Sequence, residues 1–162
     1  MQTFLTYASD DFSHTAQSLD RLRLNKQALE AWQIMMTNLK MDPQGNYREP
    51  KGWANHPAVR MWKGYEITLF NYIKAMTDEW KDRGYKTTIL TKAHRVILAA
   101  FDEDLIYTDD LPYWMMDENL YSDIVSSHRT SLLVKNYDWY SQFDWNENTA
   151  IKPTTYEYVW PE

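Results

Sequence analysis

The sequence contains no cysteine and few glycines or prolines, and these absences exclude several kinds of protein. Without cysteine, the 162-residue chain has no disulfide framework, no thiolate metal site and no cysteine nucleophile. Such a composition fits the reducing cytoplasm best. Four glycines and six prolines are too few for a turn-rich all-β architecture. We therefore expect a cytoplasmic protein that is built mainly from helices.

Signals for membranes, metals and common cofactors are also missing. No apolar run approaches the roughly 20 residues that span a bilayer, and residues 1–11 lack the basic segment of a signal peptide. The four histidines lie far apart, and the acidic residues 102–110 lack the spacing and glycine of a calcium loop. No phosphate-binding glycine-rich loop or Gly-x-Ser-x-Gly elbow occurs. We expect no membrane partner, no metal and no cofactor, which leaves chemistry that acidic, basic and cationic side chains perform.

Aromatic residues and acidic charge dominate what is present. The chain has eight Trp, twelve Tyr and five Phe, and 44% of its residues are hydrophobic, which is enough for a core. Because Tyr and Trp need partners for their polar edges, some should line a groove or an interface. The net charge is −6, whereas proteins that bind duplex DNA usually carry a basic surface. Any nucleic-acid site must therefore be a local patch.

Hydrophobic periodicity predicts a mainly α, compact, single-domain helical bundle over residues 1–162. Two long helices are expected, at residues 13–40 with Ser13 as N-cap and at residues 57–83 with Pro57 in the first turn. Because their apolar stripes are the widest, they should pack together, so that Leu29 and Leu69 are not both exposed. Shorter helices are expected at residues 87–101 and 121–136. Residues 137–162 read as an aromatic-rich, irregular tail that packs back on the helices.

The first polar cluster lies on the first long helix. Asp20, Arg23, Gln27 and Glu30 are spaced by three, four and three residues, so they share one face, and Lys26 is close to Arg23. Cations on one face can grip a phosphate, and Asp20 could orient them or act as a base. The alternative is the solvated face of an amphipathic helix, and spacing alone leaves both open.

The second cluster stands at the start of the second long helix. Asn55 and His56 precede Pro57, where free backbone N–H groups make an anion site, and Arg60 follows one turn later. The alternative is that Asn55 or His56 merely caps the helix.

The third cluster is His128 with Arg129, next to several Ser and Thr residues in the last predicted helix. This pair suits phosphate contact or general acid catalysis. A polar turn that faces solvent is the alternative.

Five motifs in order identify the chain by resemblance. They are Asp-Arg-x-Arg-Leu-x-Lys-Gln at residues 20–27, Gly-Trp-x-Asn-His-Pro-Ala-x-x-Met-Trp-x-Gly-Tyr-Glu at 52–66, Arg-Gly-Tyr at 83–85, Ser-His-Arg-x-x-Leu at 127–132 and Tyr-Val-Trp-Pro at 158–161. This order resembles the pyrimidine-dimer DNA glycosylase-like family of small bacterial and phage proteins. The resemblance covers nearly the whole chain, with residues 87–119 more divergent.

The resemblance implies a compact helical enzyme that cuts an N-glycosidic bond in damaged or modified DNA and then nicks the strand as an AP lyase. In the better understood relatives the N-terminal amine attacks the sugar C1′ and forms an imine, helped by an acidic residue on the first long helix and by nearby arginines. Extrusion of a base from the stack gives access. The implied partner is a DNA or nucleotide substrate in the cytoplasm of a bacterium or an infected host.

The resemblance also assigns roles to residues of this chain. Asp20 is the expected acid–base group, because it is the only carboxylate in the matching basic stretch. The amine belongs to Met1, since the large side chain of Gln2 hinders removal of the initiator Met, or to Lys26, whose neutral form is favoured by the neighbouring Arg23. The expected substrate ligands are Arg21, Arg23, Gln27, Asn55, His56, Arg60, His128 and Arg129. We predict a basic pocket floored by Arg21, Arg23, Lys26 and Arg60, with Asn55 at its rim.

Two other functions remain open at this point. One is a catalytically silent phage or bacterial module on the same fold that binds a nucleotide or a host protein. The other is an interaction protein that uses its aromatic tail as an interface. Convergence of Asp20, Arg23, Asn55 and His128 on one pocket would favour an enzyme or a nucleotide binder, and scatter would favour the interaction protein.

Overall fold

The computed structural model describes residues 1–161 and is mainly helical. The long helices are α2 (Arg21–Leu39), α4 (Glu66–Asp82), α5 (Ile89–Asp102) and α7 (Glu118–Lys135). The short ones are α1 (Ser13–Ser18), α3 (Pro57–Arg60), α6 (Tyr113–Met116), α8 (Tyr137–Tyr140) and the 3₁₀ helix η1 (Ser141–Phe143). In this described range there is no β-strand, only an isolated bridge between Met41 and Tyr47. None of the described helices is long and apolar enough to cross a membrane.

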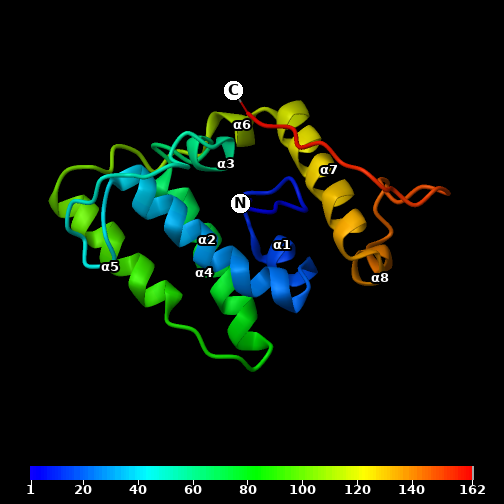
Figure 1. The fold of residues 1–162 in the computed structure, drawn as a ribbon, viewed down its shortest axis with the longest axis horizontal. Coiled ribbons are helices and arrows are strands. Elements are labelled where there is room, and N and C mark those ends of the chain that lie inside the picture. Colours follow the sequence, from blue (N-terminus) through cyan, green and yellow to red (C-terminus); the bar gives the residue numbers. More distant parts are fainter. Residues whose placement is uncertain (162) are drawn as a thin grey trace.

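Helices α2 and α4 form the central pair, and α5 packs against both of them (Figure 1). Leu69, Ile73 and Met76 of α4 are fully buried, as are the α2 residues Ile34 and Met35. Leu29 is 38% exposed, but Leu69 is not exposed at all. The mainly α bundle around two long helices, and the packing of those helices on each other, are therefore confirmed.

The first long helix is shorter than predicted. Residues 13–40 do not form one helix, because Leu19 and Asp20 adopt extended backbone angles between α1 and α2. The Arg83 guanidinium donates to the carbonyls of Ala16, Gln17 and Leu19 at 3.3, 3.2 and 2.8 Å, which satisfies the end of α1. Ser13 is the first helical residue rather than the cap that we predicted. Long-range hydrogen bonds thus stabilise a break that the apolar pattern does not reveal.

The second long helix is also divided. The predicted helix over residues 57–83 contains α3, a turn, and then α4. Gly64 has a φ of +86° at this turn, in the region that favours glycine. The buried carboxylate of Glu66 accepts the Gly64 N–H at 3.2 Å and so fixes the start of α4. Gly64 and the Glu66 carboxylate therefore stabilise the turn between α3 and α4.

The remaining elements lie close to their predicted positions. Helices α5 and α7 correspond to the helices expected at residues 87–101 and 121–136, with ends shifted by up to three residues. The predicted tail begins with α8 and η1 and is irregular afterwards. Figure 1 shows this last segment running back along α7, where the Tyr158 hydroxyl bonds the Ser131 hydroxyl at 2.7 Å.

An extended N-terminal segment, residues 2–6, runs through the interior between the α2–α4 pair and α7 (Figure 1). All five of its residues are buried. The backbone N–H of Phe4 donates to Gln27 Oε1 at 2.7 Å, and that of Leu5 donates to His128 Nδ1 at 2.9 Å. The segment therefore ties α2 to α7 and fixes where Met1 emerges.

Candidate functional site

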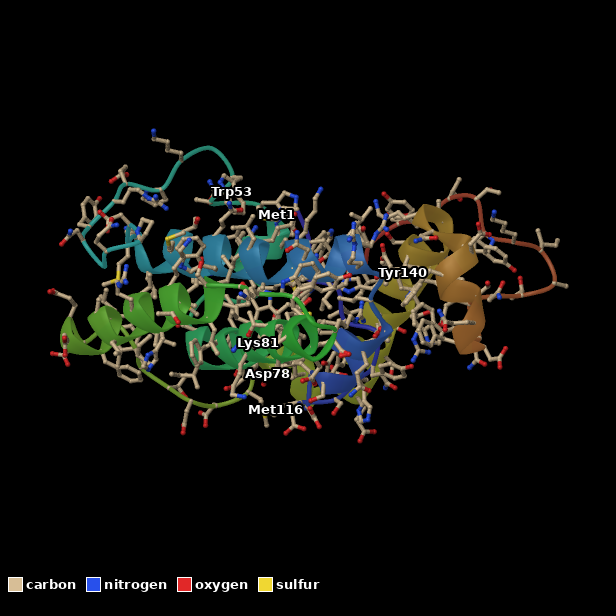
Figure 2. The ribbon with its side chains drawn as sticks, turned by 90° about the horizontal axis from the view of Figure 1, so that it is seen from below. Met1, Trp53, Asp78, Lys81, Met116 and Tyr140 are labelled. Atoms are coloured by element: carbon tan, nitrogen blue, oxygen red, sulfur yellow. The ribbon has the colours of Figure 1, made fainter. Side chains whose placement is uncertain are left out.

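Met1 emerges at the surface from this rigid segment. Its side chain is 42% exposed, although Gln2 behind it is only 5% exposed. Tyr72 of α4 also holds the segment, because its hydroxyl donates to the Phe4 carbonyl at 2.8 Å. Met1 and Trp53 lie together on one side of α2, while Lys81 and Asp78 of α4 lie on the other (Figure 2). Met1 is thus the exposed end of a segment, residues 2–6, that is buried and held by hydrogen bonds.

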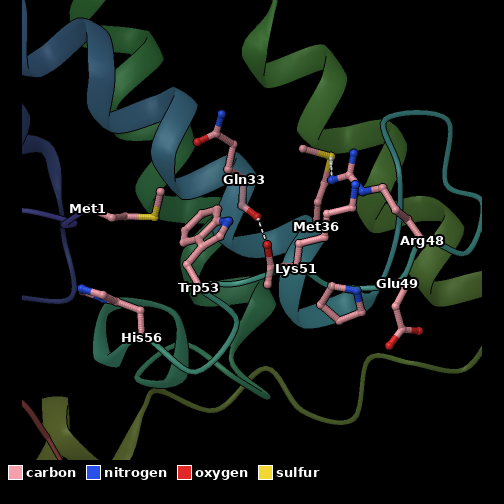
Figure 3. A pocket seen from close by; sticks show the side chains of 10 residues that line it. Met1, Gln33, Met36, Arg48, Glu49, Lys51, Trp53 and His56 are labelled. Atoms are coloured by element: carbon pink, nitrogen blue, oxygen red, sulfur yellow. Dashed lines mark hydrogen bonds between the residues drawn. The ribbon is translucent and has the colours of Figure 1, made fainter.

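A hollow of about 680 Å³ opens on one side of Met1, and we call it the Trp53 hollow. Its wall includes Met1, Gln33, Arg48, Lys51, Trp53 and His56. Figure 3 shows the Met1 side chain reaching toward the Trp53 ring, with His56 beside it. The hollow therefore combines an aromatic ring with two cations.

A second hollow of about 660 Å³ opens on the other side of Met1, and we call it the Tyr158 hollow. Helix α2 contributes Arg23, Lys26 and Glu30 to its wall, and the N-terminal segment contributes Gln2 and Phe4. Lys135, Tyr156 and Tyr158 come from the C-terminal part of the chain. Met1 lines both hollows and stands where they meet.

The two hollows are locally basic in an acidic protein. Together they are lined by five Lys and Arg residues and two Glu residues, although the chain carries a net charge of −6. Glu30 is the carboxylate on the Tyr158 side, and Gln27 Nε2 lies 3.4 Å from its Oε2. The local balance favours an anionic ligand such as a phosphate.

His56 lines the same hollow as Met1. Burial and, secondarily, the Met1 ammonium lower the pKa of the His56 imidazole. Its Nδ1 accepts the backbone N–H of Ala58 at 3.0 Å, so the neutral ring carries its hydrogen on Nε2. His56 therefore caps α3, as one of our alternatives stated, and its remaining polar atom is a donor.

The structure brings five of the predicted site residues to these hollows. Arg23, Lys26 and Gln27 line the Tyr158 hollow, His56 lines the Trp53 hollow, and Met1 lines both. They come from α2, from the N-terminal segment and from the residue before α3. Met1 is the residue that the two hollows share, so His56 of the second cluster and the first-cluster residues lie on different sides of it.

Asp20 lies apart from these hollows, in a buried polar contact. Its carboxylate accepts a hydrogen bond from the Tyr140 hydroxyl and is 3.3 Å from the Arg23 guanidinium. Burial of the Tyr140 hydroxyl, followed by its hydrogen bond to this carboxylate, raises the pKa of Tyr140. Asp20 is 5% exposed and is not among the residues that line either hollow. In this arrangement it fixes Arg23 rather than facing Met1.

The predicted basic pocket needs a correction in its membership. Arg21 lines a separate hollow with Tyr85, Arg83 and Trp139, and its guanidinium stands 5.9 Å from the Tyr85 ring centroid. Arg60 and Asn55 are exposed but line neither hollow beside Met1. Arg21 and Arg23 are two residues apart on α2, about 200° around the helix axis, so their side chains point to different sides.

His128 and Arg129 hold the N-terminal segment in place. His128 is fully buried, and burial lowers its pKa to about 3, so the ring is neutral. Arg129 Nε donates to the Thr6 carbonyl at 2.8 Å, and its guanidinium lies 3.5 Å from Glu147. Neither lines a hollow beside Met1. Asp20, Arg23, Asn55 and His128 do not meet in one pocket, and this criterion by itself favours the interaction protein.

Several lining residues were not predicted from the sequence. Tyr156 and Tyr158 carry a usable signal, since residues two apart in an extended segment point to the same side. Arg48 and Lys51 stand in a polar connector, where neither spacing nor periodicity marks them. Across residues 1–161, no three His, Asp or Glu side chains gather in a way that could hold a metal ion.

The comparisons with known proteins give one match. The family model for pyrimidine dimer DNA glycosylase matches residues 1–93, which is more than half of the chain. The matched span contains the N-terminal segment, α1 to α4 and the start of α5. No curated protein and no solved structure gives a significant match.

Proposed function

Because the chain belongs to the pyrimidine dimer DNA glycosylase family, we propose that it cleaves the N-glycosidic bond of a damaged or modified nucleotide in DNA. One observation carries the proposal. Met1 stands exposed at the end of a rigid buried segment, where two hollows lined by cations and aromatic rings meet. Residues 1–162 act as one domain in this function, since Lys135, Tyr156 and Tyr158 complete the Tyr158 hollow.

The α-amine of Met1 is the proposed nucleophile. An unprotonated amine attacks the sugar C1′, and the bond from C1′ to the base breaks. Opening of the sugar ring then gives an imine, which activates the sugar for strand cleavage, so AP-lyase activity is part of the proposal. The hydrogen bonds on Phe4 and Leu5 fix the backbone behind the amine, and such positioning lowers the barrier to attack. Lys26, in the same Tyr158 hollow, is the alternative amine.

Glu30 is the proposed carboxylate. Cleavage of the glycosidic bond develops positive charge on the sugar, which a nearby carboxylate stabilises. Glu30 lines the hollow that holds Met1, whereas the Asp20 carboxylate is engaged by Tyr140 and Arg23. Asp20 is the proposed positioning residue for Arg23. The acid–base role that the resemblance implies for Asp20 stays a prediction.

The cations are the proposed phosphate ligands. Arg23, Lys26 and Lys135 lie on one side of Met1, and Arg48 and Lys51 lie on the other. A strand whose target sugar sits at Met1 can therefore place flanking phosphates on both sides. Arginine and lysine supply the charge-assisted hydrogen bonds that such phosphates accept.

The test combines base release with covalent trapping. The protein is incubated with ultraviolet-irradiated, base-modified and unmodified DNA and with free nucleotides, and released bases are identified by mass spectrometry. Borohydride is added in parallel, and peptide mapping locates the adduct. We expect base release from one class of DNA and an adduct on Met1.

The controls separate the alternatives. Acetylation of the α-amine should abolish trapping. Lys26→Gln removes a proposed phosphate ligand, so it should weaken DNA binding while the adduct stays on Met1. An adduct on Lys26 would reassign the nucleophile, and release without any adduct would reject the amine mechanism. Tight nucleotide binding without base release would instead support a catalytically silent nucleotide-binding module.

A further inference from the structure

The buried end of the Tyr158 hollow contains a polar group without a partner. Gln2 lines this hollow and is 5% exposed. Its Oε1 accepts the backbone N–H of Thr3 at 2.9 Å, but its Nε2 is buried and has no hydrogen-bond partner within residues 1–161. Buried amide donors are rarely left unpaired in folded proteins, so this one marks a place for a ligand acceptor.

Aromatic rings make up the walls around this donor. Phe4 is buried beside it, and the rings of Tyr156 and Tyr158 lie 5.1 Å apart between centroids. Tyr158 is fixed by its hydrogen bond to Ser131 and by an edge contact with the His128 ring at 5.6 Å. Flat, fixed rings favour a planar heterocycle, and a hollow of about 660 Å³ is in the size range of small-molecule sites.

The cations of the hollow indicate where the phosphate of such a ligand would bind. Arg23 is only partly buried and Lys26 is exposed, whereas Gln2 and Phe4 are buried. A nucleotide would therefore put its base at the buried end and its phosphate toward the cations. Gln2 adjoins Met1 in the chain, so the donor lies next to the proposed nucleophile.

We infer that this hollow holds a pyrimidine base and that Gln2 Nε2 donates a hydrogen bond to the O2 carbonyl oxygen of that base. The inference rests on the proposed function. In a pyrimidine, O2 stands on the carbon next to the nitrogen of the glycosidic bond, so a base whose C1′ faces Met1 presents O2 to Gln2. A purine has no exocyclic acceptor on the corresponding carbon.

The proposed hydrogen bond assists the departure of the base. The nitrogen of the Met1 amine forms a bond to C1′ as the bond from C1′ to N1 of the base breaks. The electron pair of the broken bond moves onto the base and spreads from N1 to O2, where the Gln2 amide stabilises it. The proton lost by the amine balances the charge, and the base leaves in its neutral, protonated form. A fixed donor at a developing oxyanion acts in this way in other enzymes.

The test is the substitution Gln2→Met, which keeps the side-chain length and removes the amide. The new methionine at position 2 is also large, so the initiator Met1 is not removed, and intact mass spectrometry verifies this. With single-stranded oligonucleotides that carry uracil, thymine or 5-fluorouracil at one position, we expect kcat to fall on the order of 10²-fold, with little change in KM. The loss should be smallest for 5-fluorouracil, because the most acidic base needs the least stabilisation.

A matched control and a stability measurement complete the experiment. Gln44→Met makes the same change in an exposed loop residue and should leave all rates unchanged. Thermal melting of Gln2→Met identifies loss of fold, and Gln2→Leu provides a second variant of similar size.

The outcomes separate the inference from the proposed function. If the wild type releases pyrimidines and Gln2→Met does so at the same rate, or with an equal loss for every base, the inference is rejected while the proposed function stands. Release of purines as efficiently as pyrimidines also rejects it. If the wild type releases a purine but no pyrimidine from any of the DNA substrates, the inference is rejected and the proposed function stands. If it releases no base from these oligonucleotides or from ultraviolet-irradiated and base-modified DNA, the proposed function and the inference are both rejected.

Discussion

His128 illustrates how burial sets the charge of one side chain. The ring is fully buried between Phe4 and Tyr158, and its Nδ1 accepts the Leu5 N–H. Its Nε2 has no partner within the described residues, so protonation of the ring would leave a cation in an apolar site. Burial accordingly lowers the pKa of His128 from 6.5 to about 3.

This shift predicts a pH dependence of stability. In the unfolded chain His128 binds a proton below pH 6.5, whereas in the folded chain it stays neutral down to about pH 3. The unfolded state therefore binds more protons in this window, and the free energy of unfolding falls as the pH decreases, by at most about 1.4 kcal/mol per pH unit. Urea unfolding at several pH values measures the slope.

The control for this prediction is a variant that keeps the acceptor. His128→Asn offers an oxygen to Leu5 and does not titrate, so its slope should be shallower than that of the wild type. His14→Asn changes an exposed histidine and should leave the slope unchanged. Equal slopes in all three proteins would contradict the assignment.

The two acidic candidates on the first long helical region can be separated by substitution. Glu30→Gln should lower the rate of base release 10²- to 10⁴-fold, on the order expected for loss of a positioned acid–base group. Asp20→Asn should act mainly through Arg23, raising KM more than it lowers kcat, because Asp20 is bonded to Arg23 and Tyr140. Single-turnover kinetics on the substrate found in the panel measure both. A wild-type rate in Glu30→Gln would return the role to Asp20.

The connector between α2 and α3 packs tightly on α5 at a single glycine. Gly45 has a φ of +84°, and a Cβ built on it would lie 2.5 Å from the Ala99 Cβ. Gly45→Ala therefore adds both a strained backbone and a steric clash, and we expect a loss of about 3 kcal/mol in the free energy of unfolding. Chemical denaturation measures this value.

Gly84→Ala is the matched control. Gly84 also has a positive φ, of +94°, but nothing lies within 4 Å of its added Cβ. Only the backbone strain remains there, and we expect a cost of about 1 kcal/mol. Adding Ala99→Gly to Gly45→Ala should recover part of the loss, and a double mutant without any recovery would contradict the proposed contact.

The helices show what periodicity predicts and what it misses. The apolar spacing that predicted residues 13–40 and 57–83 reports burial of side chains, and most of those side chains are buried in α2 and α4, although Leu22 and Leu29 are exposed. It does not report the backbone at Leu19 and Asp20, where Arg83 and the Tyr140 hydroxyl supply the hydrogen bonds. Such partners are more than 60 residues away in sequence. Helix existence was therefore predictable, and helix continuity was not.

The site was predictable only where one helix carries it. Arg23, Lys26 and Gln27 share a face of α2, and their spacing placed them together correctly. Arg48, Lys51 and the tail tyrosines reach Met1 through loops, whose path depends on packing that spacing does not encode. Asp20 precedes α2 as its N-cap residue, and Arg23 and Tyr140 engage its carboxylate outside the hollow, which the sequence pattern did not indicate.

At the scale of the whole molecule, the small number of cations at the site limits how many DNA phosphates the protein can contact. Five cations line the hollows of a chain whose net charge is −6. If each contacts one phosphate, the slope of log K against log salt concentration is no steeper than about −4.5. Fluorescence anisotropy with a labelled oligonucleotide at several salt concentrations measures the slope.

Variants assign this slope to the hollows. Lys51→Gln and Lys135→Gln should each make it shallower by about 0.7 to 0.9. Lys74→Gln removes a cation that is paired with Asp78 at 2.6 Å on α4 and should have no effect. A slope far steeper than five contacts allow would place DNA on another surface.

The buried N-terminal segment also has a consequence for the order of events during synthesis. Leu5 and its partner His128 are separated by 123 positions, so the ribosome makes residues 2–6 long before α7 exists. At about 5–20 residues per second, this segment waits roughly 6–25 seconds for that partner. The two hollows beside Met1 therefore cannot be complete on a nascent chain, and the proposed amine becomes an organised nucleophile only after the last long helix has left the ribosome.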